Sequence, residues 1–391
     1  MRRGVVLLLY IAILVSEMSW SAVAPLLPSF AERFSLSDSA AGLILSVASM
    51  AILLVSIPAG ALVGRIGARR LTVVSAVTMT LGNVGVGLAP TYGWLLAGRA
   101  VFGLGVGMLW VGSTSWLHVA AGDRRARALS MTSAVIGIGS LIGPAFAGVV
   151  GEHLGLGAPF LALAGANLAV VIALVLESSG TAGATGVQEP ALRDMVRAAG
   201  GDDLIRGSVL LMLTGSLLWL TSYLLVPLRL DAAGWSASDI GVAFSVSSLI
   251  YAGVSWVVAR RAERLATLGV AAAATGGLAL SLLVVVASAS VGATVAFLML
   301  AGIATAVMIA LTFPLGVAGS GHVSVALVGG LLNVAWAVSG LVGPTLGGIA
   351  AQTIGDRLTF LLLAVLTGAA ALWMLRARRS VAGFADIAAA P

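Results

Sequence analysis

The chain of 391 residues contains no cysteine and no lysine, and only 9% of its residues are charged. The absence of cysteine excludes disulfides, zinc–thiolate sites and iron–sulfur clusters. Soluble domains carry about 25% charged residues, whereas 60% of this chain is hydrophobic and its mean hydropathy is +1.10. The composition therefore predicts an all-α membrane protein that crosses the bilayer many times, and the net charge of +6 is no sign of nucleic-acid binding.

The sequence also lacks the patterns that hold nucleotides and metals. No Gly-Lys-Ser/Thr tripeptide occurs, and Gly103-x-Gly105 lies inside an apolar run rather than in a phosphate-binding loop. The three histidines, His118, His153 and His322, are scattered without metal-ligand spacing. We therefore expect no cofactor, no metal and no enzymatic activity, and any energy source would be a gradient.

Apolar runs long enough to cross a bilayer as a helix, about 20 residues, recur throughout the chain. Met1-Arg2-Arg3 before the first run resembles a signal peptide, but Glu17 interrupts the run and Pro25 would follow the cleavage site, so we interpret it as an uncleaved span. The sequence predicts twelve transmembrane helices, at residues 4–28, 41–63, 71–90, 93–118, 128–150, 158–176, 207–229, 240–259, 267–288, 291–316, 325–350 and 358–376.

The arginines predict the orientation of these helices. If the N-terminus is cytoplasmic, seventeen arginines fall in cytoplasmic segments and three fall outside, namely Arg33, Arg229 and Arg357, while Arg99 lies within the fourth span. Cytoplasmic loops carry an excess of Lys and Arg. We therefore expect a multi-pass protein of the cell (inner) membrane with both termini in the cytoplasm.

The two halves of the chain repeat each other at an offset of 199 or 200 residues. The corresponding positions are Gly42 and Gly241, Gly143-Pro144 and Gly343-Pro344, Gly148 and Gly348, and Phe160 and Phe360. Parallel repeats of six spans, with a site between them, are a transporter architecture. The expected division is a six-helix half at 1–176, a cytoplasmic linker at 177–206, a second six-helix half at 207–379 and a cytoplasmic tail at 380–391.

Glu17 is the acid placed deepest in a predicted span. It lies too far from either membrane surface for its side chain to reach water, and an ionisable group there costs at least a few kcal/mol. Such a residue normally faces a polar cavity, where a carboxyl group can gain and lose a proton. The alternative is a protonated glutamate that is hydrogen-bonded between helices.

The loop after the second span reads Gly60-Ala61-Leu62-Val63-Gly64-Arg65-Ile66-Gly67-Ala68-Arg69-Arg70. It resembles the loop signature of the major facilitator superfamily, with Gly64 at the position of the family's acid. In the second half the repeat aligns Glu263-Arg264 with Gly64-Arg65. Positive-inside topology alone would also explain the arginines. The resemblance implies a cytoplasmic gating loop that consists of Gly60, Arg65, Gly67, Arg69, Arg70, Glu263 and Arg264.

The fourth span carries Arg99-Ala100-Val101-Phe102-Gly103-Leu104-Gly105. This segment is similar to the superfamily's Arg-x-x-x-Gly-x-Gly pattern, in which the arginine of proton-coupled members influences proton transfer. The resemblance implies a proton-coupling role for Arg99 together with Glu17. The alternative is an arginine that snorkels to the nearby interface.

The fifth span carries Gly139-Ser140-Leu141-Ile142-Gly143-Pro144-Ala145-Phe146-Ala147-Gly148. It looks like the signature of the exporting members, so the chain resembles the 12-span drug:H+ antiporters of the superfamily. Pro144 removes a backbone hydrogen bond and bends the helix, and small residues allow close packing, although such packing is common in membrane helices. The resemblance implies a hinge made of Gly139, Gly143, Pro144 and Gly148 and, in the eleventh span, Gly343, Pro344, Gly347 and Gly348.

In this fold the first, fourth, seventh and tenth helices line a central cavity, to which the eighth and eleventh contribute. Aromatic walls with one acid suit cationic or amphipathic molecules through stacking and cation–π contacts. Tryptophan can equally face lipid or pack between helices. The substrate-binding residues we expect are Glu17, Trp20, Trp110, Ser113, Trp116, Trp219, Tyr223, Tyr251, Asn333 and Trp336.

These features predict a secondary transporter that exports a lipophilic or cationic small molecule in exchange for protons by alternating access. Since Arg99 is the only basic residue in the predicted spans, multiply charged anions are disfavoured as substrates, whereas sugars and neutral metabolites stay open. A substrate-specific metabolite, sugar or amino-acid transporter, working as a symporter or uniporter, is the alternative, and a receptor or scaffold is a remote one. The expected partners are the substrate, protons and the lipid bilayer, and the resemblance implies a monomer.

Overall fold

The computed structural model describes residues 3–121, 125–177, 202–319 and 325–388. Within these residues it contains fourteen α-helices and no strand, which confirms the all-α prediction. In chain order the helices are α1 (Arg3–Ser21), α2 (Val23–Arg33), α3 (Asp38–Ile66), α4 (Ala68–Gly87), α5 (Tyr92–Ala121), α6 (Arg125–Leu154), α7 (Ala158–Leu176), α9 (Asp203–Ala232), α10 (Ala237–Ala259), α11 (Ala262–Leu265), α12 (Leu268–Ala287), α13 (Val291–Ala318), α14 (Val325–Ile354) and α15 (Asp356–Ala388).

Eleven helices in the described part of the chain are long and apolar enough to cross a membrane. The span predicted at 71–90 coincides with α4, which is not among the eleven. Its 20 residues include Arg69, Arg70 and Asn83, and this polarity lowers its mean hydropathy. Since α4 packs lengthwise against α5 and α7, it is nevertheless a full member of the bundle.

The span predicted as one helix at 4–28 is two helices, α1 and α2, which meet at Ala22. Pro25 has no N–H group to donate to the carbonyl of Ser21, and Pro28 likewise leaves the carbonyl of Ala24 without its usual donor. The regular ladder is therefore interrupted one turn after Glu17. The prediction of a single helix was wrong here, and it also ended too early, because α2 continues to Arg33.

The turns that begin the second span of each half show the repeat in atomic detail. Ser37 accepts a hydrogen bond from the backbone of Ala40 and caps α3, while Ser236 caps α10 by accepting one from Asp239. Each cap follows a residue with positive φ, Ser35 at 51° in the first half and Gly234 at 87° in the second. Side-chain capping satisfies backbone N–H groups that have no partner within the helix, so both halves start this helix in the same way.

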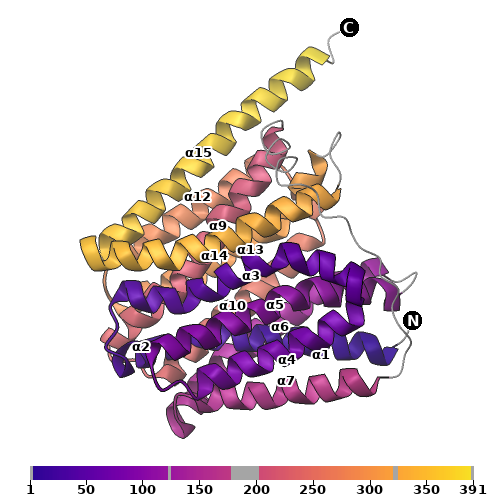
Figure 1. Cartoon of the computed structure of the whole chain (residues 1–391). Coiled ribbons are helices and arrows are strands. Elements are labelled where there is room, and N and C mark those ends of the chain that lie inside the picture. The colour runs from indigo at the N-terminus through magenta and orange to yellow at the C-terminus, as the bar shows by residue number, and fades with distance from the viewer. Residues whose placement is uncertain (1–2, 122–124, 178–201, 320–324, 389–391) are drawn as a thin grey trace.

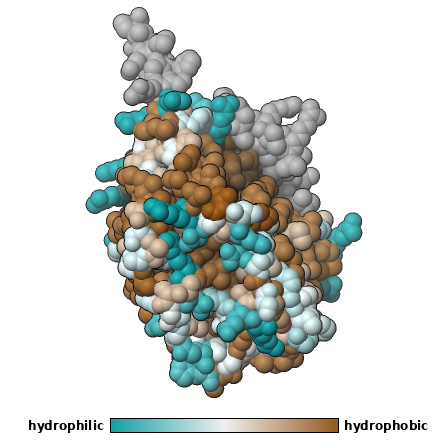
Figure 2. Space-filling view, turned by 90° about the vertical axis from the view of Figure 1, so that its left-hand side faces the viewer, coloured by the Kyte–Doolittle hydropathy of each residue, from teal (hydrophilic) through white to brown (hydrophobic). Residues whose placement is uncertain are grey.

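The helices form two bundles that lie side by side, α1–α7 and α9–α15 (Figure 1). The bundles meet along two seams, α3 against α14 and α6 against α10, and α2 also packs on α9. The start of α1 and the end of α15 lie at one end of the molecule and α2 lies at the other, which we call the α2 end. Hydrophilic residues gather on the face seen in Figure 2, which includes the α2 end.

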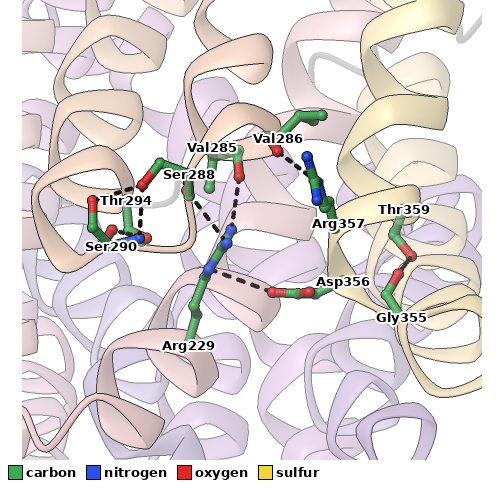
Figure 3. A network of polar contacts seen from close by, with 10 residues as sticks. All are labelled: Arg229, Val285, Val286, Ser288, Ser290, Thr294, Gly355, Asp356, Arg357 and Thr359. Atoms are coloured by element: carbon green, nitrogen blue, oxygen red, sulfur yellow. Dashed lines mark hydrogen bonds and ion pairs between the residues drawn. The ribbon is translucent and has the colours of Figure 1, made fainter.

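A polar network fastens the second bundle at the α2 end (Figure 3). The Arg229 side chain at the end of α9 lies 3.4 Å from a carboxylate oxygen of Asp356 on α15 and donates to the Val285 carbonyl of α12 at 3.2 Å. Arg357 donates to the Val286 carbonyl at 2.8 Å. In the first bundle, Arg33 makes the equivalent bond to the Ala89 carbonyl at 3.2 Å. The network therefore ties α9, α12 and α15 together within one half.

The predicted linker at 177–206 falls mostly on residues 178–201, which lie outside the described residues, and α9 begins inside it at Asp203. The tail expected from residue 380 is helical as far as Ala388, because α15 continues beyond the span predicted at 358–376. Residues 389–391 lie outside the described part.

Candidate functional site

Glu17 lies on α1 at its contact with α6, where it is half-buried. Its carboxylate oxygen Oε1 accepts a hydrogen bond of 2.8 Å from the Ser140 hydroxyl. The glycines of α6 allow this approach, since a methyl group placed on Gly139 would lie 2.7 Å from Cβ of Glu17 and one on Gly143 would lie 2.8 Å from the Met18 carbonyl oxygen. The acid therefore faces protein and holds a defined polar contact.

Four aromatic rings of the second half form what we call the aromatic cluster: Trp219 and Tyr223 on α9, and Phe244 and Tyr251 on α10. The ring centroids of Trp219 lie 5.5 Å from those of Tyr223 and 5.8 Å from those of Tyr251, and Tyr223 lies 5.1 Å from Phe244 in an edge-on arrangement. Tyr223 is only 2% exposed. Such offset and edge-on pairs are the favourable geometries for aromatic rings.

The aromatic cluster and Glu17 belong to opposite halves but interact with each other. Tyr223 and Tyr251 are both close enough to interact electrostatically with the Glu17 carboxyl group. One carboxylate next to several aromatic rings can bind an organic cation, because the charge satisfies the acid while the ring faces attract the cation and its apolar groups. The arrangement can therefore recognise a cation from both halves at once.

A second aromatic contact crosses between the halves nearby. The rings of Trp20 on α1 and Trp336 on α14 lie 5.7 Å apart, and the guanidinium of Arg99 lies 5.5 Å from the Trp20 ring. Arg99 also stacks on Phe102 and donates from Nε to the Ile44 carbonyl at 3.0 Å. Its exposure is 1%, so it does not snorkel to the surface, and its Nη2 finds no partner among the described residues.

The remaining expected substrate residues lie apart from this site. Trp116 is 3% exposed inside the core of the first half, and Ser113 is fully buried beside it on α5. Trp110 is 39% exposed and takes no part in the ring contacts of the aromatic cluster. Asn333 is an exposed residue of α14. Of the ten residues expected, the structure brings together Glu17, Trp219, Tyr223 and Tyr251, with Trp20 and Trp336 as a second pair.

The contacts seen for the first-half residues of the expected gating loop lie within that half. Gly67, with φ of 84°, ends α3 and allows the reversal into α4. Arg69 donates to the last carbonyls of α7, at 3.1 Å for Val175, and so caps that helix. Arg65 and Arg70 are exposed and Gly60 is half-buried. In the second half Arg264 is exposed on α11, and the Glu263 side chain lies outside the described set.

Two of the expected hinge glycines, Gly148 and Gly348, lie at the two seams at backbone distance. A methyl group on Gly148 of α6 would lie 2.3 Å from the Ala237 carbonyl oxygen of α10, and one on Gly241 would lie 2.4 Å from that of Pro144. The α3–α14 seam repeats this contact with Gly348 against Asp38 and Gly42 against Pro344, at 2.5 and 2.3 Å. Gly343 and Gly347 approach Thr221 within the second half.

Polar contacts join the same seams at the α2 end. Glu152 on α6 accepts a hydrogen bond from the Ser238 backbone at 3.0 Å, and Gln352 on α14 accepts one from the Ser39 hydroxyl at 2.6 Å. Ser245 of α10 accepts one from the backbone of Ala145 at 3.1 Å. Among the described residues, the hydrogen bonds across the two seams lie from Pro144 outward toward this end, so the halves are closed there.

Sequence reasoning missed Ser140, Phe244 and Ser245. A phenylalanine in an apolar run gives no signal, and a serine in a membrane helix usually bonds its own backbone, as Ser19 does with Val15. The repeat could have pointed to Ser140, because the first half reads Gly139-Ser140 where the second reads Ser339-Gly340.

Comparisons with known proteins agree with this architecture. The family profile described as "Major Facilitator Superfamily" matches residues 9–322. The "Uncharacterized MFS-type transporter Ent638_1421" of Enterobacter sp. (strain 638) is 24% identical over 380 residues, with 95% of each chain covered. The "Multi-drug resistance efflux pump PmrA homolog" of Lactococcus lactis subsp. lactis (strain IL1403) is 30% identical over 162 residues, 40% of each chain. Partial matches such as this one span less than half of the relative's length.

Among solved structures, the crystal structure of a bacterial homolog to the human lysosomal transporter Spinster, in an inward-facing and unoccupied conformation, superposes with a TM-score of 0.79. It covers 97% of both chains at 16% identity. At this identity the likeness concerns the fold alone.

Proposed function

This chain belongs to the Major Facilitator Superfamily and is a multi-pass membrane transporter that works by alternating access, and we propose that it exports lipophilic or cationic small molecules in exchange for protons. The observation that carries the proposal is the position of Glu17. It is a half-buried acid of one half that lies within electrostatic range of the aromatic cluster of the other half.

In the proposed cycle the substrate and the proton compete for the Glu17 carboxylate. An organic cation binds between the ionised acid and the faces of Trp219 and Tyr251, where cation–π attraction contributes about 1–2 kcal/mol in a desolvated site. A proton neutralises the acid and releases the cation. Because the proton and the cation neutralise the same carboxylate, the two ligands exclude each other.

Arg99 supports this exchange from a distance. Its buried guanidinium makes a cation–π contact with the Trp20 ring, which in turn contacts Trp336 of the other half. Since this stack spans both halves, rocking of the halves changes the surroundings of the guanidinium. We assign Arg99 a role in proton transfer rather than in contact with the substrate.

The α2 end is the closed end of the molecule in this structure. If both termini are cytoplasmic, as the arginine distribution predicts, the α2 end is outside and the halves are closed toward the exterior. The partial likeness to an efflux pump supports export.

The test is proton release from purified protein on addition of a panel of lipophilic cations, with tetraphenylphosphonium as the first. The wild type is expected to release protons on binding. Glu17→Gln, which mimics the protonated acid, is expected to bind the cation much more weakly, to release no proton and to lose pH-gradient-driven transport. Glu32→Gln, which neutralises an exposed acid at the α2 end, is the control that keeps both. Binding without release in the wild type would contradict antiport and indicate a uniporter or a symporter.

A further inference from the structure

At one pair of positions, the hinge helices of the two halves carry glycine and serine in opposite order. α6 carries Gly139-Ser140 before Gly143-Pro144, and α14 carries Ser339-Gly340 before Gly343-Pro344. At the repeat offset of 200 the hydroxyl has therefore moved by one position along the helix. On an α-helix one position is a rotation of about 100°, so the two hydroxyls point to different neighbours.

In the second half the hydroxyl serves the backbone. Ser339 donates to the Leu213 carbonyl of α9 at 3.1 Å and to the Ala335 carbonyl at 2.8 Å. Gly340 instead lies against the seam, where a methyl group would be 2.3 Å from Oγ of Ser49 on α3. The serine in this half is therefore a packing contact between neighbouring helices.

In the first half the same positions serve the acid. Gly139 lies against the Leu14 carbonyl, the repeat counterpart of Leu213, with 3.0 Å between that oxygen and a methyl group placed on the glycine. The hydroxyl of Ser140 is free to turn to Glu17, at 2.8 Å. The counterpart of Glu17 at the offset of 199 is Ser216, whose hydroxyl contacts the Met212 sulfur, so the second half has no carboxyl group at this place.

We propose that Ser140 is the positioning residue of the proton site: its hydroxyl donates to the ionised Glu17 carboxylate, fixes its orientation toward the aromatic cluster and sets the pH at which the acid exchanges its proton. The inference rests on the proposed antiport function. A donor to a carboxylate stabilises the charged form, and a hydrogen bond to a charged group is among the strong ones.

Few other groups act on Glu17. Among the described residues, Tyr223 from α9 and Tyr251 from α10 are titratable side chains that interact electrostatically with it. Arg99 on α5, the buried charged residue of the same half, contacts Trp20, Phe102 and the Ile44 carbonyl instead. Ser140 is therefore the side chain seen to donate to the carboxylate within the described residues.

Ser140 also lies where the charge state of Glu17 can reach the other half. Four residues later Pro144 leaves the Ser140 carbonyl without its helical donor, and the N–H of Ala145 is taken by Ser245 of α10. At the α3–α14 seam the Ser46 hydroxyl, the counterpart of Ser245, has no hydrogen-bond partner among the described residues. The connection from acid to hinge to opposite half is therefore present at the α6–α10 seam alone within the part described.

The experiment measures tetraphenylphosphonium affinity and proton release as a function of pH for the wild type, Ser140→Ala, Ser140→Thr and Ser339→Ala. Removing the donor makes the ionised acid less favourable, so Ser140→Ala is expected to move the midpoint of the pH profile upward by about one unit. Ser140→Thr retains a hydroxyl and is expected to restore the wild-type midpoint. Ser339→Ala removes the repeat-related hydroxyl and is expected to leave the midpoint unchanged.

The outcomes separate the two proposals. An unchanged midpoint in Ser140→Ala, when Glu17→Gln has lost proton release, would overturn the positioning role and leave antiport standing. Proton release that survives in Glu17→Gln would overturn the antiport proposal itself. If Ser140→Ala does not fold, Ser140→Gly, which removes the hydroxyl without adding an atom, takes its place, and a wild-type midpoint in that variant also overturns the role.

Discussion

The two halves of this transporter share a frame and differ in what they carry. Both use Gly-Pro hinges, serine-capped second helices and glycine contacts at backbone distance. The first half holds the acid and the buried arginine, Glu17 and Arg99, whereas the second half holds the aromatic cluster. The comparison shows that the repeat supplies the mechanics and that a few substitutions in each copy supply the chemistry.

The halves also differ in how tightly their outer helices pack. α4 and α5 approach through glycines, with a methyl group on Gly82 predicted to lie 2.5 Å from the Phe102 nitrogen and one on Gly98 to lie 2.7 Å from the Val86 nitrogen. The corresponding helices of the second half, α12 and α13, leave an apolar groove of about 570 Å³ between them. A methyl group on Gly277, which lines this groove, would meet no atom within 4 Å.

The largest effect we expect is on this packing difference. Gly98→Ala places a methyl group against backbone atoms that cannot move aside alone, so α4 and α5 must separate, and overpacking of this kind costs about 1–3 kcal/mol. Gly277→Ala is expected to leave stability unchanged or to raise it slightly through helix propensity. Thermal unfolding in detergent checks both. Equal melting temperatures would contradict the tight packing of the first half.

The next effect concerns the aromatic cluster. Trp219→Ala removes the ring that contacts both Tyr223 and Tyr251, and we expect about tenfold weaker binding of aromatic cations, since about 1.4 kcal/mol of cation–π and stacking energy is lost. Trp110→Ala, on a tryptophan that lies apart from the cluster, is the matched control. Titration calorimetry on the purified protein distinguishes them, and an equal loss in both would move the binding site to α5.

A smaller effect concerns the contacts that close the α2 end. Glu152 carries a charge toward the first N–H groups of α10, whereas Gln352, its repeat counterpart, meets Ser39 without charge. A negative group near a helix N-terminus is favoured by the helix dipole. We expect Glu152→Gln to shift the population toward opening at this end by about twofold to threefold, and Gln352→Glu to shift it the other way.

Distance measurements between spin labels are the readout for this pair. The chain has no cysteine, so labelling sites can be introduced without removing native thiols. Identical distance distributions in both variants would show that the Glu152 charge does not contribute to closure.

The smallest effect concerns the Arg229–Asp356 pair, which the first half lacks because Leu156 occupies the repeat position of Asp356. The aspartate side chain is 46% exposed, and exposed ion pairs contribute little. We expect Asp356→Ala to lower the free energy of unfolding by about 0.5 kcal/mol or less, with transport unchanged. Arg229→Ala also loses the bonds to Val285 and Ser288 and is expected to cost more. The reverse order would make Asp356 the centre of the network.

Much of the fold could be predicted because membrane crossing has a simple length rule. The runs of about 20 apolar residues predicted the helical bundle. The motifs that recur at an offset of 199 or 200 residues predicted its two halves. Pro25 alone could not predict that the helix breaks at Ala22. Proline is tolerated in membrane helices when neighbouring groups form hydrogen bonds with the backbone groups that it leaves without a partner.

The site was harder to predict than the fold. Glu17 could be singled out because its charge contrasts with an apolar run. Trp110 and Trp116 could not be separated from Trp219, because a membrane helix is apolar on its lipid-facing and core-facing sides alike and so loses the periodicity that marks the inward face of a soluble helix. The contact of Ser140 with Glu17 depends on a shift of the serine by one position along the helix, which turns its hydroxyl toward α1. Only the packed structure reveals this.

A single methyl group at any of the four seam glycines would prevent the halves from closing at the α2 end. These glycines are Gly42, Gly148, Gly241 and Gly348. Each faces a carbonyl oxygen of the opposite half at a distance that no alanine side chain fits, and each lies where the halves must part when the α2 end opens. An alanine at any of them is compatible with the parted halves and incompatible with the closed ones. The chain thus offers four positions at which a glycine-to-alanine substitution would trap the state that is open at the α2 end. A trapped protein would allow the structure of that state to be determined and compounds that enter from that side to be screened.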